Sequence, residues 1–200
     1  MKTTLYRPGS DELGELTRGF VMADRINDIL ARPNSKQHRD YLSLIRDQFM
    51  GEPVFDHNDQ YREQAKELLP RALDHFNRRH EISVIEGLLF IHSEEFPMIA
   101  AAPDAVWGDL VGLTVHIRQS EETYAAAVER GVDKEMERHA QAMMLVTGLP
   151  IWLHLSYFED ANERVRRLHE HEVEFNERHA EELEDAMIGF ILKSRLRAAA

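Results

Sequence analysis

Hydrophobic positions along the chain change their spacing near residue 80, from the period of helices to that of strands. In the first part the pattern predicts three helices, over about 11–31, 35–51 and 57–80. Ser10 and Ser35 suit the start of the first two helices, because a serine hydroxyl can accept from a free backbone N–H there. Pro70 lies inside the third helix, where we expect a kink or a break.

Short runs rich in β-branched and apolar residues follow, as is typical of strands inside a sheet. They predict strands over 82–92, 96–104, 112–118 and 149–159. Two helices, over 120–131 and 133–148, separate the last two strands. One long amphipathic helix is predicted from 161 to about 195. On it His169 and His171 would not share a face, so the sequence LHEHE is interpreted as solvated surface.

This order of elements predicts one domain over residues 1–200, of the α/β or α+β class, with a central mixed β-sheet flanked by helices. The domain would comprise a helical part (1–80), a sheet core with helices (81–160) and a C-terminal helix (161–200). A chain of 200 residues is long enough to bury one core of ordinary size.

Composition narrows the setting of this domain. The chain has no cysteine, no apolar run that would cross a membrane and no apolar segment of a signal peptide near its start. We therefore expect a cytoplasmic protein with no membrane partner. A net charge of −12 argues against general coating of DNA but permits a local basic channel. The acidic stretch 158–186 is interpreted as a solvated face, with mimicry of DNA as the alternative.

Residues 102–120, APDAVWGDLVGLTVHIRQS, contain the candidate chemistry. Asp104 follows a proline at the end of a predicted strand, and His116 and Arg118 share one face of the next strand. Glu63, on the third predicted helix, is a further carboxylate. Carboxylates, waters and a substrate phosphate are the usual ligands of Mg²⁺. Taken singly, each of these residues is better explained as a turn or surface position than as part of a site.

Five segments, in order, match motifs of one family. They are DELGELTRGFVMADRINDILA (R-x-G-x-x-T-A-S), YLSLIRDQFMGEP (T-G-E), DQYREQAKELLPRALDHFN (G-x-x-x-E-x-x-A), APDAVWGDLVGLTVHIRQS (S-P-D-G, then E-x-K) and HAQAMMLVTGLPIWLHLSYF (Q-x-Q-M-x-V-T-G). The chain thereby resembles, over nearly its whole length, the lambda exonuclease and YqaJ-type viral recombinase family of PD-(D/E)XK nucleases. The resemblance implies their nuclease fold, with a degenerate active site.

The resemblance implies a role at each matching position. Glu63 corresponds to the glutamate of the family's helix motif, and Asp104 to its metal-binding aspartate. His116 stands where the second metal-binding carboxylate belongs and Arg118 where the catalytic lysine belongs. Gln141 corresponds to the glutamine that supports the site from the next helix. A metal would thus be held by Asp104, Glu63 and, with a changed ligand type, His116.

Other positions depart from the family's motifs. Asp59 and Ala105 replace glycines, Ala102 replaces a serine, and Thr17, Met22 and Asp24 occupy the arginine, threonine and serine positions of the first motif. In the family this arginine and serine help to hold the 5′ phosphate of DNA, which Asp24 would repel. Arg18, one residue from the arginine position, and Arg25 are the remaining candidates for binding phosphate.

These replacements leave three hypotheses open. A neutral histidine suits Zn²⁺ or Mn²⁺ better than Mg²⁺, and arginine cannot lose a proton as a base. The first hypothesis is a phage-type recombination protein with a weakened or lost nuclease centre. The second is an active 5′–3′ double-strand DNA exonuclease that uses Mg²⁺ or Mn²⁺, with Glu121 or Glu122 as a replacement carboxylate. The third is an acidic inhibitor of a host DNA-processing or defence enzyme.

Partners follow from the same resemblance. We expect double-stranded DNA ends as the nucleic-acid partner, and a single-strand annealing protein or a host DNA-processing enzyme as the protein partner. A metal cofactor, Mg²⁺ or Mn²⁺, is expected if the protein is active, and none if it is not. Because members of the family form trimeric rings that thread duplex DNA, we expect a homo-oligomer, with a homotrimer as the first choice and a monomer or dimer as the alternatives. Asp104, Glu63, His116 and Arg118 should then border one cleft.

Overall fold

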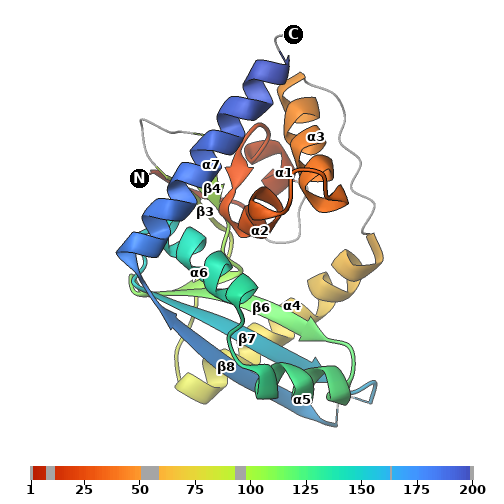
Figure 1. Ribbon diagram of the computed structural model, residues 1–200. Coiled ribbons are helices and arrows are strands. Elements are labelled where there is room, and N and C mark those ends of the chain that lie inside the picture. Colours follow the sequence, from red (N-terminus) through yellow and green to blue (C-terminus); the bar gives the residue numbers. More distant parts are fainter. Residues whose placement is uncertain (1, 8–11, 51–58, 93–97, 163, 199–200) are drawn as a thin grey trace.

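The computed structural model describes residues 2–7, 12–50, 59–92, 98–162 and 164–198 (Figure 1). In chain order the elements are β1 (Lys2–Leu5), α1 (Glu12–Leu16), β2 (Val21–Met22), the 3₁₀ turn η1 (Ala23–Arg25), α2 (Ile26–Leu30), α3 (Lys36–Met50), α4 (Asp59–His80), β3 (Leu88–Ile91), β4 (Ile99–Ala101), β5 (Ala105–Trp107), β6 (Val111–Arg118), α5 (Glu121–Arg130), α6 (Lys134–Thr147), β7 (Ile151–Glu159), β8 (Arg166–Glu174) and α7 (Glu177–Ala198).

The strands form two four-stranded sheets with orders β1-β3-β4-β2 and β5-β6-β7-β8. Both sheets are mixed, since β2 pairs with β4 and β6 with β7 in parallel, while the other pairs are antiparallel. An isolated bridge between Ile85 and Val106 pairs the segment before β3 with β5 of the second sheet. The expected α+β fold with mixed strands and flanking helices is confirmed, although two small sheets replace the single central one.

The sheet β5-β6-β7-β8 has the longer strands and is called the larger sheet. Helices cover both of its faces. In Figure 1, α4 crosses one face, and α5 and α6 lie on the other. The first core cluster joins Leu73 and Phe76 of α4 to Leu113 and Leu155 of the sheet. The second joins α2, α3, α6 and α7 to the smaller sheet and to Trp152. Alternate residues of β6 and β7 therefore point toward α4 or toward α5 and α6.

The first predicted helix, over 11–31, is wrong in its continuity. The chain forms α1, turns at Gly19, which has φ 80°, and then runs as the short strand β2 before α2 begins. Val21 is fully buried and pairs in parallel with Ile99, so a sheet contact outweighs the local helical pattern. Ser10, the expected cap, lies outside the described residues.

The predicted C-terminal helix over 161–195 is wrong in its first part, which is strand β8. This strand pairs antiparallel with β7, from Ile151 opposite Glu174 to Glu159 opposite Arg166. Residues two apart on a strand share a face, so the LHEHE histidines do lie together, with ring centroids of His169 and His171 4.3 Å apart. Interpreting them as a solvated helix is therefore incorrect.

The remaining elements lie close to their predicted positions. The hydroxyl of Ser35 accepts from the backbone N–H of His38 at the start of α3, as expected of a cap. Helix α4 continues through Pro70, so no break occurs there. Strands β3, β4 and β7 and helices α5 and α6 fall within the predicted ranges, and β6 begins one residue earlier, at Val111. Strands β1 and β5 were not predicted. Among the described residues, no helix is long and apolar enough to cross a membrane.

Candidate functional site

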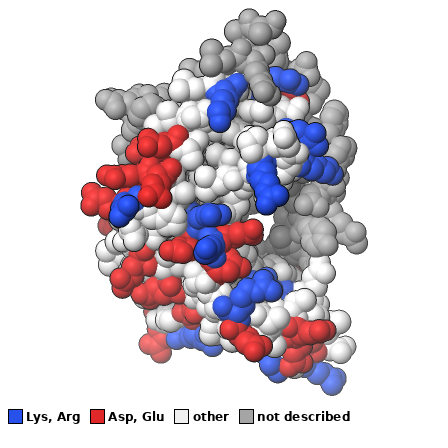
Figure 2. Space-filling model, in the orientation of Figure 1, with Lys and Arg blue, Asp and Glu red and all other residues white. Residues whose placement is uncertain are grey.

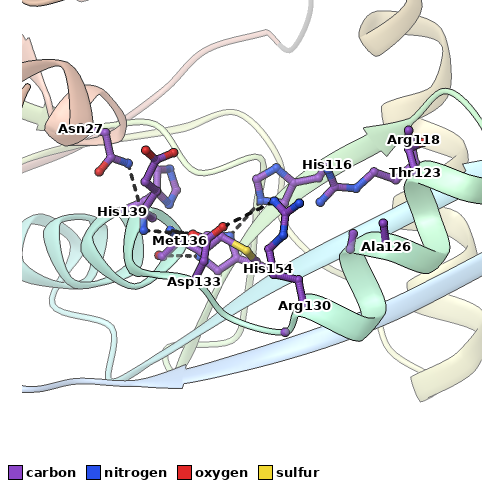
Figure 3. A pocket seen from close by; sticks show the side chains of 13 residues that line it. Asn27, His116, Arg118, Thr123, Ala126, Arg130, Asp133, Met136, His139 and His154 are labelled. Carbon is purple, nitrogen blue, oxygen red and sulfur yellow. Dashed lines mark hydrogen bonds and ion pairs between the residues drawn. The ribbon is translucent and has the colours of Figure 1, made fainter.

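A pocket of about 430 Å³ opens between the end of β6, helices α5 and α6, and Asn27 of α2. His116 and Arg118 of β6 form one wall, and His154 of β7 forms its floor (Figure 3). The parallel register of β6 and β7 places His116 opposite Ser156 and brings these polar side chains to the face covered by α5 and α6. The sequence therefore correctly predicts that the side chains of His116 and Arg118 share one face.

The histidines of this wall form a chain of hydrogen bonds that fixes their protonation. The carbonyl of Met136 can only accept, so Nε2 of His154, 2.9 Å away, donates to it. In the neutral ring Nδ1 of His154 must then accept from Nε2 of His116, at 3.0 Å. This leaves Nδ1 as the unprotonated nitrogen of His116.

Burial keeps these rings neutral. Desolvation, together with the neighbouring His154, lowers the pKa of His116 to about 3. Desolvation likewise lowers the pKa of His154 to about 4, although its bond to the Met136 carbonyl opposes the shift. The pKa of His139, on α6, falls to about 3 for the same reason. At neutral pH these three histidines therefore contribute aromatic surface and hydrogen-bonding groups but no positive charge.

Two arginines supply the positive charge of the pocket. The guanidinium of Arg118 is held by Ser156, whose hydroxyl oxygen lies 3.3 Å from Nε and 3.1 Å from Nη2. Desolvation, followed by the charge of Arg130, lowers the pKa of Arg118. Figure 3 shows the two guanidinium groups pointing toward one another beside the His116 ring. Arg130 makes one long ion pair, 4.0 Å, with Asp133.

Polar atoms without partners lie in the lining of the pocket and in the strand beside it. Among the described residues, three buried side-chain polar atoms have no hydrogen-bond partner, namely Asn27 Oδ1, His139 Nδ1 and His171 Nε2. Asn27 and His139 line the pocket, and His171 pairs with His154 in the neighbouring strand. Unsatisfied buried polar atoms are rare in protein interiors, so their concentration here sets this region apart from ordinary core.

Asp104 lies beside the same strand but interacts with other residues. Its carboxylate accepts from the backbone N–H of Val115 at 2.7 Å, one residue before His116. Desolvation, opposed by the Val115 bond and assisted by the charges of Asp24 and Glu86, raises the pKa of Asp104 to about 6. Asp104 is not among the residues that line the pocket. The candidate site thus has a carboxylate side and a histidine–arginine side.

Asp24 and Tyr6 belong to the carboxylate side. Asp24 is exposed, and its charge acts on both Asp104 and Tyr6. Desolvation raises the pKa of Tyr6 to about 12, and the charges of Asp104 and Asp24 contribute. Asp24, Tyr6 and Asp104 therefore lie near one another.

The described residues do not by themselves supply a metal site. No group of three or more His, Asp or Glu side chains within the described part of the chain is arranged to hold a metal ion. Nε2 of His116 is already committed to His154, and the Asp104 carboxylate is partly committed to a backbone N–H. A divalent cation would prefer several free oxygen ligands around it. Within the described residues, therefore, the donor set fits Mg²⁺ or Mn²⁺ poorly.

The other predicted site residues have separate surroundings. Glu63 lies within α4, but its side chain is outside the described residues. Gln141 is buried and binds the start of α7, since its amide nitrogen donates to the carbonyl of Glu174 and its oxygen accepts from the N–H of Asn176. Gln141 thus fixes the connection between β8 and α7.

The two candidate phosphate-binding arginines differ in their exposure and in their bonds to other side chains. Arg18 is exposed. Arg25 is bonded to Asp28 and stacks over the Tyr41 ring, with 4.7 Å between the guanidinium carbon and the ring centroid. Glu121 binds Arg167 at 2.5 Å, on the outer side of α5 from the pocket lining.

Sequence reasoning missed several residues of the pocket, above all His154, His139 and Arg130. The first of these had a signal, because a histidine at the centre of the apolar strand IWLHLSYF is a buried polar group that needs a partner. His139 and Arg130 become part of the site only through the packing of α5 and α6 on the sheet. No local pattern reveals that arrangement.

Solved structures of exonucleases are similar to this one over nearly the whole chain. The alkaline exonuclease LHK-Exo from Laribacter hongkongensis is 19% identical, with a TM-score of 0.79 and 95% of both chains covered. Its complex with dAMP gives 18% identity and a TM-score of 0.78. A phage-related exonuclease from Haemophilus somnus is 11% identical, with a TM-score of 0.65 and coverage of 93% of this chain and 96% of the other.

Comparison at the level of sequence gives no such match. No protein-family model matches the chain, and no curated protein matches it. Identities below 25% establish the fold and nothing more, so the chain has the fold of these exonucleases. The fold expected from the family motifs is thereby supported, and the chemistry has to be argued from the site.

Proposed function

We propose that this protein binds the ends of double-stranded DNA through an exonuclease fold whose metal-dependent cleavage is weakened or lost. The observation that carries the proposal is the state of His116 and Arg118. They occupy the strand positions of a carboxylate and a lysine in the family motif, and both are bonded within the protein, to His154 and Ser156. A neutral imidazole adds no negative charge for a metal ion, and a guanidinium cannot act as a base.

The distribution of charge supports a DNA partner despite the net charge of −12. Figure 2 shows many acidic side chains on the side of α7; Lys and Arg side chains lie above and below a hollow near the middle of the same face, and acidic side chains also lie beside it. Phosphate binding needs a local concentration of positive charge. Negative charge on the rest of the protein surface does not prevent such binding.

An active nuclease is the second candidate, and Asp104 favours it. Asp104, Asp24 and Glu86 lie close enough for their charges to raise the pKa of Asp104. Cation binding at such a group would favour the ionised carboxylates and offset their mutual repulsion. The alternative enzyme would be a 5′–3′ exonuclease with altered metal ligands.

A nuclease assay separates these candidates. Linear duplex DNA is incubated with the natural protein and with the double variant His116→Glu, Arg118→Lys, in Mg²⁺, in Mn²⁺ and with a chelator. The variant restores a carboxylate and a compact ammonium, each worth about 3 kcal/mol of transition-state stabilisation, or on the order of a hundredfold in rate. We expect the variant to cleave measurably faster than the natural protein in Mg²⁺, with Asp24→Ser increasing the rate further.

Binding of DNA is measured in parallel with the chelator present, so that cleavage does not interfere. End binding that weakens steeply with salt is expected for either a nuclease or a DNA-binding protein of this fold. If the natural protein degrades DNA and the double variant loses that activity, His116 and Arg118 are working ligands and the proposed loss of cleavage is wrong. Absence of DNA binding at low salt would reject the DNA partner itself and favour an acidic inhibitor.

A further inference from the structure

The pocket beside His116 brings together two arginines that no carboxylate holds closely. Among the described residues Arg118 makes hydrogen bonds to Ser156 and none to a carboxylate, although the charge of Asp133 acts on it from nearby. Arg130 has one weak pair with Asp133, at 4.0 Å. Like charges that point toward one another repel, and Arg130 lowers the pKa of Arg118 through this repulsion. An anion bound between the two guanidinium groups would offset this repulsion and stabilise the charged form of both arginines.

We propose that Arg118 and Arg130 bind the phosphate group of a nucleotide in this pocket. Ser156 occupies Nε and one side of Nη2 of Arg118, which leaves Nη1 to donate. A guanidinium fork fixed in this way matches two phosphate oxygens, and little side-chain freedom is left to lose on binding. Arg130, at the end of α5, closes the site from the opposite side (Figure 3).

The rest of the pocket suits a nucleotide in size and character. A cavity of about 430 Å³ is within the usual range for small-molecule sites and is too small for a duplex. Ala126, Ala127 and Met136 give it an apolar side, and the neutral rings of His116 and His154 give it an aromatic one. Such surfaces accept a base or sugar without demanding a further charge.

Two sources would present this chemistry, the terminal phosphate of a DNA strand and a free nucleotide. The terminal phosphate rests on the proposed function, since a protein that binds DNA ends meets it there. The position filled by Asp24 is unfavourable for phosphate, so binding at Arg118 and Arg130 would place the phosphate in this pocket instead. Asp133 and Glu135 also line the pocket, and their negative charge favours one phosphate held directly by the arginines over a ligand with several phosphates.

The experiment compares phosphate probes with chelator present throughout. Calorimetry measures inorganic phosphate and dAMP, and fluorescence anisotropy measures linear duplexes with 5′-phosphate or 5′-hydroxyl ends. The variants are Arg118→Gln and Arg130→Gln, the second of which changes a side chain that is 68% exposed and therefore leaves folding intact. Arg178→Gln, at a side chain 91% exposed on α7, removes the same charge elsewhere and is the matched control.

We expect each pocket variant to weaken dAMP and phosphate by about tenfold or more, because a hydrogen bond to a charged group is lost. The control should bind as the natural protein does. If 5′-phosphorylated duplex binds tighter than the 5′-hydroxyl form and the variants abolish the difference, the strand end is the source. If only the small probes respond, the source is a free nucleotide.

The outcomes separate this inference from the proposed function. Binding of every phosphate probe unchanged by both variants, with natural folding by circular dichroism, rejects the phosphate site even where DNA ends bind normally. Arginine-dependent binding of dAMP by a protein that ignores DNA ends supports the phosphate site and rejects the DNA-end function.

Discussion

His116, His139 and His154 form one layer between the larger sheet and helix α6, with ring centroids of the His154 pairs 5.2 Å apart. In the unfolded chain each ring would titrate near its ordinary pKa of 6.5, whereas burial lowers the pKa in the folded state to about 3, 3 and 4. Below pH 6.5 the unfolded chain therefore binds protons that the folded protein excludes. Folding is weakened as pH falls through this window.

We predict that the free energy of unfolding decreases steeply between pH 6.5 and 4. Each histidine contributes on the order of 1 kcal/mol per pH unit in this range. Asp104 acts in the opposite direction: its folded pKa, about 6, exceeds the ordinary value of 3.8, so its contribution grows as pH falls from 6. Three histidines outweigh this carboxyl group, and urea unfolding followed by circular dichroism at pH 7, 6 and 5 measures the net effect.

The variant His139→Met tests the assignment to these residues. It removes one titrating ring and a buried nitrogen without a partner, so below pH 6, where Asp104 offsets one of the three histidines, the dependence on pH should lose about half of its net slope. Equal slopes in the natural protein and His139→Met would contradict the prediction.

At the scale of elements, the contact of β6 with β7 depends on Gly112. A Cβ atom there would lie 2.1 Å from Cζ3 and 2.3 Å from Cε3 of Trp152, which is fully buried. The indole cannot move away easily, because its Nε1 donates to Thr114 at 3.0 Å. We predict that Gly112→Ala lowers the free energy of unfolding by about 1–3 kcal/mol, seen as a lower urea midpoint.

Gly189 provides the control for this prediction. It lies within α7, and a Cβ atom there would have no neighbour within 4 Å. Gly189→Ala should therefore stabilise the protein by about 0.5–1 kcal/mol, because alanine loses less backbone entropy in a helix. If both variants destabilise equally, close packing against Trp152 is not the cause.

Helices were predictable where capping residues stand at their ends. Helix α5 begins at the capping box of Ser120 and Thr123, and α6 begins at Asp133, which accepts from two backbone N–H groups, and ends at Gly148 with φ 71°. Strand β8 lacks such signals. Its apolar residues Leu168 and Val173 belong to different core clusters, one on each face of the sheet, so neither strand nor helix periodicity is evident.

The candidate site was predictable to the same limited extent. Spacing alone indicates that His116 and Arg118 share a face, and family motifs single out Asp104. The partners that determine their chemistry, His154 and Arg130, come from a different strand and a helix end. Sheet register and helix packing bring them together, and these depend on contacts distant in sequence.

At the scale of the whole molecule, charge affects assembly and DNA binding in opposite directions. Each chain carries a net charge of −12, so chains that associate repel one another over distances comparable to the Debye length, about 8 Å at physiological salt. Salt screens this repulsion. Binding of DNA phosphates by arginine and lysine releases counterions and is weakened by salt.

We therefore predict a homotrimer, in keeping with the family motifs, whose formation is favoured as NaCl rises from about 20 to 150 mM, while DNA-end binding falls over the same range. Light scattering with size-exclusion chromatography measures the mass at each salt concentration, and anisotropy measures DNA binding. The mass and its dependence on salt exclude two alternatives. General aggregation would raise the mass beyond three chains. A ring held together by attraction between unlike charges would dissociate as the salt concentration rises. A monomer at micromolar concentration throughout would exclude the ring, and DNA would then have to be bound by a single open subunit.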